Sequence, residues 1–171
     1  MPSNTLTTLP YYGAGMILLN EDDHVLILQD HRAKKWSFPK GAPEVYDYEQ
    51  PLLTAKRECE EECGLQAGDD YDLLDWKPVI HFNRFFYFGR MKPGAETRIK
   101  LQETEICAYQ WLNPRKSCDY WMNLNSGVRH YMKVQRGFFD IKPRWTTPLN
   151  PCGIKTSVGL KCVRPIPVRI I

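Results

Sequence analysis

Near the start of the chain, two apolar runs flank a polar segment and predict a β-hairpin. Residues 13–19 and 25–28 are apolar, and residues 20–24 between them are polar. Short apolar runs that flank a turn-forming segment are typical of paired strands. Further apolar and aromatic runs predict strands near 72–80, 84–90 and 106–112.

Between these strands the apolar positions change to a helical period. Pro51 suits the first turn of a helix, and Gly64 is a natural end for one, so a helix is predicted over 51–63. Its buried stripe is expected to consist of Leu52, Ala55, Cys59 and Cys63. A second helix is predicted over about 126–137, with Val128, Tyr131, Met132 and Gln135 along one side. Helices among strands indicate a mixed α/β domain.

Composition limits the class of protein. The 171 residues are 43% hydrophobic and 25% charged, which is ordinary for a globular domain. No apolar run approaches the roughly 18 residues that span a membrane, and the first ten residues do not resemble a signal peptide. We therefore expect a cytoplasmic protein, with the nucleus as an alternative, no membrane contact and no obligate protein partner. Cys59 and Cys63 could bind a metal, but buried free cysteines are the preferred interpretation.

The net charge of +3 is unevenly placed along the chain. Residues 141–171 contain six Lys or Arg, five Pro and no Asp or Glu. This composition predicts a domain over 1–140 followed by an extended, basic C-terminal tail. A basic tail can contact polyanions such as RNA, or it can be a solvated terminus.

The segment 57–65 carries most of the candidate chemistry. On a helix, Glu58, Glu61 and Glu62 share one flank beside the buried stripe, while Glu60 points elsewhere. Such carboxylates repel by about 0.2–0.5 kcal/mol per pair, and the helix C-terminus disfavours negative charge further. A divalent cation reverses both effects, so the cluster indicates a site for Mg²⁺, with Mn²⁺ as a substitute. A solvated acidic face is the alternative.

Residues 57–65, Arg-Glu-Cys-Glu-Glu-Glu-Cys-Gly-Leu, resemble the second half of the Nudix box, G-x5-E-x7-R-E-U-x-E-E-x-G-U, where U is aliphatic. Glu49 stands at the required distance before Arg57. Seven residues separate Gly41 from Glu49 where the pattern has five, so we expect two inserted residues in the loop before Glu49. The resemblance extends over roughly residues 10–140.

The resemblance implies a Nudix α/β/α sandwich with a mixed β-sheet and a loop-helix-loop catalytic box. It also implies metal ligation by Glu58, Glu61 and Glu62, with the residue at Glu58 acting as general base in some members. Arg57 would pair with Glu49 to orient the site. Glu105 is our choice for an additional ligand or base from a later loop, with Glu103 in reserve.

Three main functions fit the resemblance, with diphosphoinositol polyphosphates and other nucleotides as further candidate substrates. The preferred one is Mg²⁺-dependent hydrolysis of a diphosphate linkage in a small nucleotide, above all a dinucleoside polyphosphate such as diadenosine tetraphosphate. Hydrolysis at an RNA 5′ end, cap or triphosphate, is the second, and the basic tail favours it. A non-catalytic Nudix-fold binding module is the third, but such modules typically lose glutamates that are present here. The expected substrate contacts are Lys40, Gly41, Phe82 and Phe139.

Overall fold

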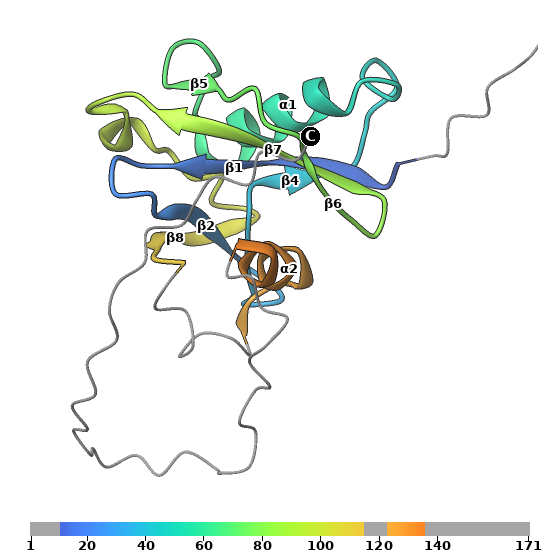
Figure 1. Ribbon diagram of the computed structural model, residues 1–171. Helices are drawn as coiled ribbons and strands as arrows, with labels where there is room; N and C mark the ends of the chain where they lie inside the picture. The colour runs from blue at the N-terminus through green and yellow to red at the C-terminus, as the bar shows by residue number, and fades with distance from the viewer. Residues whose placement is uncertain (1–10, 115–122, 136–171) are drawn as a thin grey trace, which may run out of the picture.

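The computed structural model describes residues 11–114 and 123–135, which form one mixed sheet with a helix on each face (Figure 1). In chain order the elements are β1 (Gly13–Leu19), β2 (Val25–Asp30), β3 (Trp36–Ser37), β4 (Lys40–Gly41), α1 (Pro51–Cys63), β5 (Tyr71–Leu73), β6 (Val79–His81), β7 (Arg84–Met91), the 3₁₀ helix η1 (Ala95–Arg98), β8 (Ile106–Leu112) and α2 (Ser126–Gln135). Tail residues 141–171, the proposed boundary at 140 and Phe139 lie outside the described residues.

The centre of the sheet is the parallel pair β1 and β7, which are in register from Gly13 with Arg84 to Leu19 with Arg90. The main path through the sheet is β3-β2-β1-β7-β5, and its other pairings are antiparallel. Three more strands extend the sheet: β4 pairs with β1, β6 with β7, and β8 with β2. The short β4 thereby runs antiparallel to the first residues of β1, with Ala14 opposite Gly41.

Two apolar cores, one on each face of the sheet, confirm the predicted α/β/α layers. The first lies under α1 and includes Cys59, Cys63 and alternate residues of β1 such as Met16 and Leu18. The second lies on the other face, where Val128, Tyr131 and Met132 of α2 pack with residues such as Ile17 and Phe86. The central strands are thus buried on both faces, as expected where helices cover a sheet.

The structure confirms the predicted hairpin, the helix over 51–63 and the strands β7 and β8. Gly64 ends α1 in the left-handed conformation at φ 73°, which glycine adopts without strain. In the helix stripe, Ala55, Cys59 and Cys63 are fully buried, whereas Leu52 is only half-buried. Cys59 and Cys63 are free thiols inside the core, which supports the apolar interpretation.

The strand predicted over 72–80 is wrong in one respect, because it is two short strands. Both β5 and β6 pair antiparallel with β7, but residues 74–78 between them leave the ladder. Pro78 lies in this gap, and proline cannot donate a ladder hydrogen bond. Among the described residues no helix is long and apolar enough to cross a membrane.

Candidate active site

The flank of α1 that carries the box glutamates lies against β4. Glu58 and Glu62 are 9% and 7% exposed, whereas Glu61, one turn from Glu58, is on the surface. Glu60 points away from them, and its Oε1 accepts a hydrogen bond from Gln66 Nε2. The helical phase predicted for these glutamates is therefore confirmed.

Arg57 joins several anionic groups around this flank. Its guanidinium donates to Asp47 Oδ2 at 2.9 Å, to Glu58 Oε1 at 2.7 Å and to Glu61 Oε2 at 2.9 Å. It also donates to the backbone oxygen of Ala42 at 2.8 Å. One half-buried arginine thus holds the loop before α1 and two of the glutamates together.

The predicted pairing of Arg57 with Glu49 is wrong, because Asp47 takes that place. Asp47 is 1% exposed, and its Oδ1 accepts the Glu44 N–H at 2.6 Å, while Glu49 is exposed. Burial alone would raise the pKa of Asp47, but hydrogen bonds from Arg57 and the Glu44 N–H outweigh it and hold that pKa below its usual value. Five residues separate Gly41 from Asp47, which is the box spacing counted from the glycine. The two extra residues therefore lie after the acid, between Asp47 and the helix.

Strand β4 contacts both buried glutamates. The Lys40 backbone N–H donates to Glu62 Oε2 at 3.1 Å. A Cβ built on Gly41 would overlap the Glu58 carboxylate, so only glycine lets that carboxylate lie against the strand. The structure therefore brings Lys40 and Gly41 to the glutamates, through the backbone of both residues.

The loop before β8 adds Glu105 to the same region. Its backbone is fastened to the end of α1, where Lys100 N donates to Cys63 O at 3.0 Å and Gln102 N to Glu62 O at 3.1 Å. Glu105 N in turn donates to Gln102 O at 2.9 Å. The exposed Glu105 is close enough that its charge raises the pKa of Glu58 and of Glu62, whereas Glu103 is not among the main causes of either shift.

These four side chains, Glu58, Glu61, Glu62 and Glu105, form what we call the carboxylate cluster. Burial raises the pKa of Glu62 to about 8, Lys40 opposes the shift, and the charges of Glu58 and Glu105 add to it. Burial also raises the pKa of Glu58, against Arg57 and with help from Glu61 and Glu105. The mutual repulsion is the kind that a divalent cation relieves, and carboxylate oxygens are the donors that Mg²⁺ prefers.

The carboxylates are not arranged as a finished coordination shell. Among the described residues no three His, Cys, Asp or Glu side chains converge closely enough to hold a metal ion. Two members of the cluster, Glu58 and Glu61, bond instead to Arg57, which supplies positive charge at this point. The donor set fits Mg²⁺ by its chemistry and its shared electrostatics.

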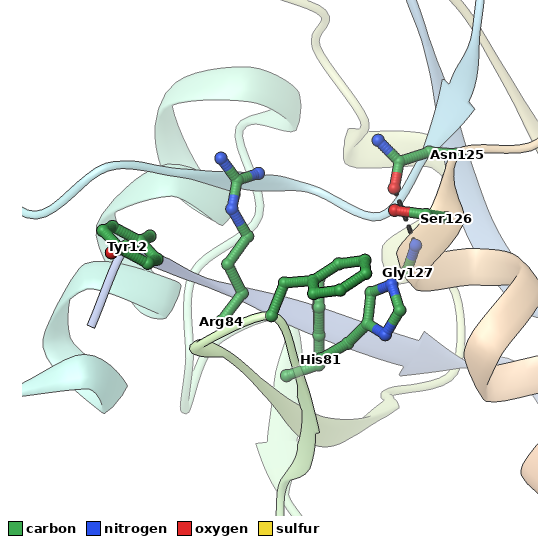
Figure 2. A pocket seen from close by; sticks show the side chains of 8 residues that line it. Tyr12, His81, Arg84, Asn125, Ser126 and Gly127 are labelled. Atoms are coloured by element: carbon green, nitrogen blue, oxygen red, sulfur yellow. Dashed lines mark hydrogen bonds between the residues drawn. The ribbon is translucent and has the colours of Figure 1, made fainter. Parts of the chain in front are cut away.

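A cavity of about 400 Å³ opens between the β6–β7 turn, the start of β1 and the start of α2 (Figure 2). It is lined by Tyr12, His81, Phe82, Arg84, Phe86, Asn125, Ser126 and Gly127. The structure thus places the predicted contact Phe82 at a cavity. The other lining residues were missed, because they come from distant segments and follow no spacing that a sequence displays.

Phe82 is the most exposed of the lining aromatics, at 79%. It occupies the two-residue turn between β6 and β7 with Asn83, and both residues have positive φ, 47° and 55°. Two positive φ values are typical of a type I′ hairpin turn, where glycine and asparagine are common and a bulky aromatic residue is strained. Strain of this kind often marks a functional position.

Comparison with known proteins decides the family. The NUDIX domain matches residues 10–128, which include the carboxylate cluster and all the residues that line the cavity. The chain belongs to the Nudix family. It is therefore an enzyme of the Nudix pyrophosphohydrolase type, and its α/β/α sheet is the Nudix fold.

Relatives of this Nudix hydrolase are similar at low identity over nearly their whole length. An RNA pyrophosphohydrolase from Bartonella bacilliformis is 29% identical, over 78% of this chain and 95% of its own. One from Pseudomonas paraeruginosa is 25% identical, over 76% and 90%. Among solved structures, a C. elegans Ap4A hydrolase superposes with a TM-score of 0.54 at 17% identity, covering 74% of this chain and 99% of that one. A Deinococcus radiodurans protein superposes with a TM-score of 0.56 at 13% identity, covering 77% and 87%.

Proposed function

We propose that this Nudix hydrolase uses Mg²⁺, or Mn²⁺ in its place, to cleave a diphosphate linkage in a nucleoside polyphosphate. The carboxylate cluster supports this proposal, because its glutamates are partly buried, repel one another and expose hard oxygen donors. All three box glutamates, Glu58, Glu61 and Glu62, are present, which argues against a non-catalytic binding module.

Each residue has a separate task in the proposed reaction. Glu58, Glu61 and Glu62 would hold the cation, and Glu105 would hold it as well or accept the proton of the attacking water. When bound, the cation supplies positive charge to the phosphates and orients water for in-line attack on phosphorus. Arg57, fixed by Asp47, keeps Glu58 and Glu61 in position. Lys40 would attract the substrate phosphates at the edge of the site, and Asp47 rather than Glu49 orients Arg57.

The substrate proposed first is a dinucleoside polyphosphate such as diadenosine tetraphosphate. The observation that carries this choice is the cavity of about 400 Å³ with the exposed ring of Phe82 at its edge. A cavity of this size suits a small ligand, and an aromatic ring offers a face on which a nucleobase can stack. One nucleoside would lie there while the phosphate chain extends to the carboxylate cluster.

The second candidate is an RNA 5′ end. The curated relatives at 29% and 25% identity are RNA pyrophosphohydrolases, and the basic residues of 141–171 would suit a polyanion. Affinity for a long RNA is dominated by phosphate contacts and falls steeply with salt. A dinucleoside polyphosphate is too small to contact basic residues spread over 31 positions, so residues 141–171 would matter for RNA and not for the dinucleotide.

One comparison of substrates tests both candidates. The full chain and a truncation after Asp140, shown by a melting curve to be folded, are assayed with Mg²⁺ on diadenosine tetraphosphate, 5′-triphosphorylated RNA, capped RNA and a diphosphoinositol phosphate. We expect turnover of the dinucleotide with KM within a few-fold in both chains. Faster turnover of RNA, lost on truncation, would make RNA the substrate. Full activity in excess chelator would contradict the metal proposal.

A further inference from the structure

Arg84 is the first residue of β7 and lies between the two parts of the site. It pairs with His81 across the β6–β7 turn and with Gly13 in the parallel neighbour β1. Its side chain lines the cavity, and Figure 2 shows it extending between Tyr12 on one side and Asn125 and Ser126 on the other. Of the eight residues that line the cavity, Arg84 is the single arginine, and none of the eight is acidic.

The guanidinium of Arg84 differs from those of Arg57, Arg90 and Arg98, whereas Arg32 and Arg129 share with it the lack of a carboxylate partner among the described residues. Arg57, Arg90 and Arg98 each have a carboxylate within 2.9 Å. Within residues 11–114 and 123–135, no carboxylate pairs with Arg84, although its side chain is half-buried. Withdrawing a charge from water without a partner is unfavourable, so this position favours an anion from outside the chain.

The position of Arg84 also connects the cavity to the carboxylate cluster. A Cβ built on Gly13 would lie 3.7 Å from Arg84 Nε and would overlap the backbone oxygen of Gly41. Gly41 itself lies against the Glu58 carboxylate. The backbones of these two glycines therefore lie between the Arg84 side chain and the Glu58 carboxylate.

One backbone donor at the start of α2 is already used within the chain. Its Gly127 N–H already donates to Asn125 Oδ1 at 2.8 Å, so the first turn of the helix is capped from within the chain. The charge available to an anion at this cavity comes from Arg84.

We propose that Arg84 binds the phosphate chain of the substrate where it passes from the cavity to the carboxylate cluster, an inference that rests on the proposed function. A guanidinium donates two parallel hydrogen bonds to phosphate oxygens, which fixes the direction of the chain as well as its position. Arg84 would thus make the enzyme prefer nucleotides with a phosphate chain long enough to extend from the cavity to the carboxylate cluster. It would act in substrate binding rather than in the bond-breaking step.

The test compares Arg84→Gln, the conservative Arg84→Lys and the matched control Arg90→Gln. Arg90 lies at the far end of the same strand, outside the cavity, and forms an ion pair with Asp23. Inorganic tripolyphosphate and adenosine are titrated separately into each metal-free protein, after melting curves show that all are folded. We expect Arg84→Gln to weaken tripolyphosphate binding by at least about tenfold, the scale of a charge-assisted hydrogen bond. Adenosine binding and the control should stay unchanged, and Arg84→Lys should recover part of the loss.

Kinetics give a second readout. For the preferred nucleotide with Mg²⁺, Arg84→Gln should raise KM by about tenfold and leave kcat within a few-fold, as expected for lost uniform binding. Equal tripolyphosphate affinity in wild type and Arg84→Gln, or an equal loss in Arg90→Gln, would overturn the assignment. Failure of the proposed function looks different, because tripolyphosphate would still bind through Arg84 while no nucleotide was hydrolysed.

Discussion

In the carboxylate cluster, the side chains on α1 are fixed by partners inside the chain, whereas the cavity presents Phe82 and Arg84 to whatever enters it. Arg57 holds Glu58 and Glu61, and the Lys40 N–H holds Glu62. At the cavity, Phe82 is exposed on a strained turn and Arg84 has no carboxylate partner among the described residues. In the proposed reaction, chemistry and recognition would therefore lie on separate elements, with the chemistry on α1 and the recognition at the β6–β7 turn.

The largest effect on activity is expected from substitutions in the carboxylate cluster. Glu62→Gln and Glu58→Gln should each lower kcat by more than about a hundredfold, because each removes a proposed ligand or base. Steady-state kinetics with Mg²⁺ measure this. Glu60→Gln is the matched control, since Glu60 lies on the same helix but bonds to Gln66 away from the cluster. Equal damage from Glu60→Gln would show that the assignment of roles along α1 is wrong.

An intermediate effect is expected at the cavity, where binding and stability should change in opposite directions. Phe82→Asn removes the stacking face and should raise KM by about tenfold, in line with about 1–3 kcal/mol for a stacked base. Asparagine tolerates positive φ, so the melting temperature should rise by about 2–4 °C. The control Ile80→Thr changes an exposed residue of β6 outside the cavity. A lower melting temperature with unchanged KM would make Phe82 a structural residue.

The smallest effect concerns how the carboxylate cluster changes the stability of the metal-free protein. The folded pKa of Glu62 is raised to about 8 from an ordinary value of 4.5, so the folded protein holds that proton more tightly than the unfolded chain. This contribution is present at low pH and is lost as the pH rises from about 5 to about 8. The melting temperature measured in chelator should therefore fall by a few degrees as the pH rises over this range.

Two additions complete that measurement. Mg²⁺ at pH 8 should restore the melting temperature, because it binds the charged carboxylates of the folded state. Glu62→Gln should flatten the pH dependence, since the variant has no proton to lose at this position. A slope that persists unchanged in Glu62→Gln would place the titrating group elsewhere.

The sequence predicted the elements with strong periodicity and the phase of the acidic helix. The helix over 51–63 and the hairpin before it are confirmed, because their apolar patterns agree with the caps and turns at their ends. The single strand predicted over 72–80 is wrong, since its interruption at residues 74–78 depends on how β5 and β6 both pair with β7. Pairing of this sort is tertiary and leaves little trace in local pattern.

The sequence indicated the glutamates of α1 and also Lys40, Gly41, Glu105 and Phe82, but it missed Asp47 and most of the residues that line the cavity. Arg57 was expected to pair with Glu49, because spacing was counted back from the helix; counting forward from Gly41 leads to Asp47, which the structure shows. Arg84 and Asn125 could not be joined from the sequence, since their segments meet only in the folded chain. The metal and substrate roles of Glu58, Glu61, Glu62, Glu105, Lys40 and Phe82 stay predictions for the experiments above.

The loop that carries Glu105 is hydrogen-bonded to α1 through main-chain atoms, Lys100 N to Cys63 O and Gln102 N to Glu62 O, while Ile99 and Leu101 pack against the core under the helix. Every amino acid except proline supplies the same N–H, so these two hydrogen bonds do not depend on the side chains at positions 100 and 102. Mutational drift at positions 100 and 102 would therefore leave Glu105 in place, whereas a proline at either would release it. The surface side chains of this loop can therefore change during evolution while the position of Glu105 is kept.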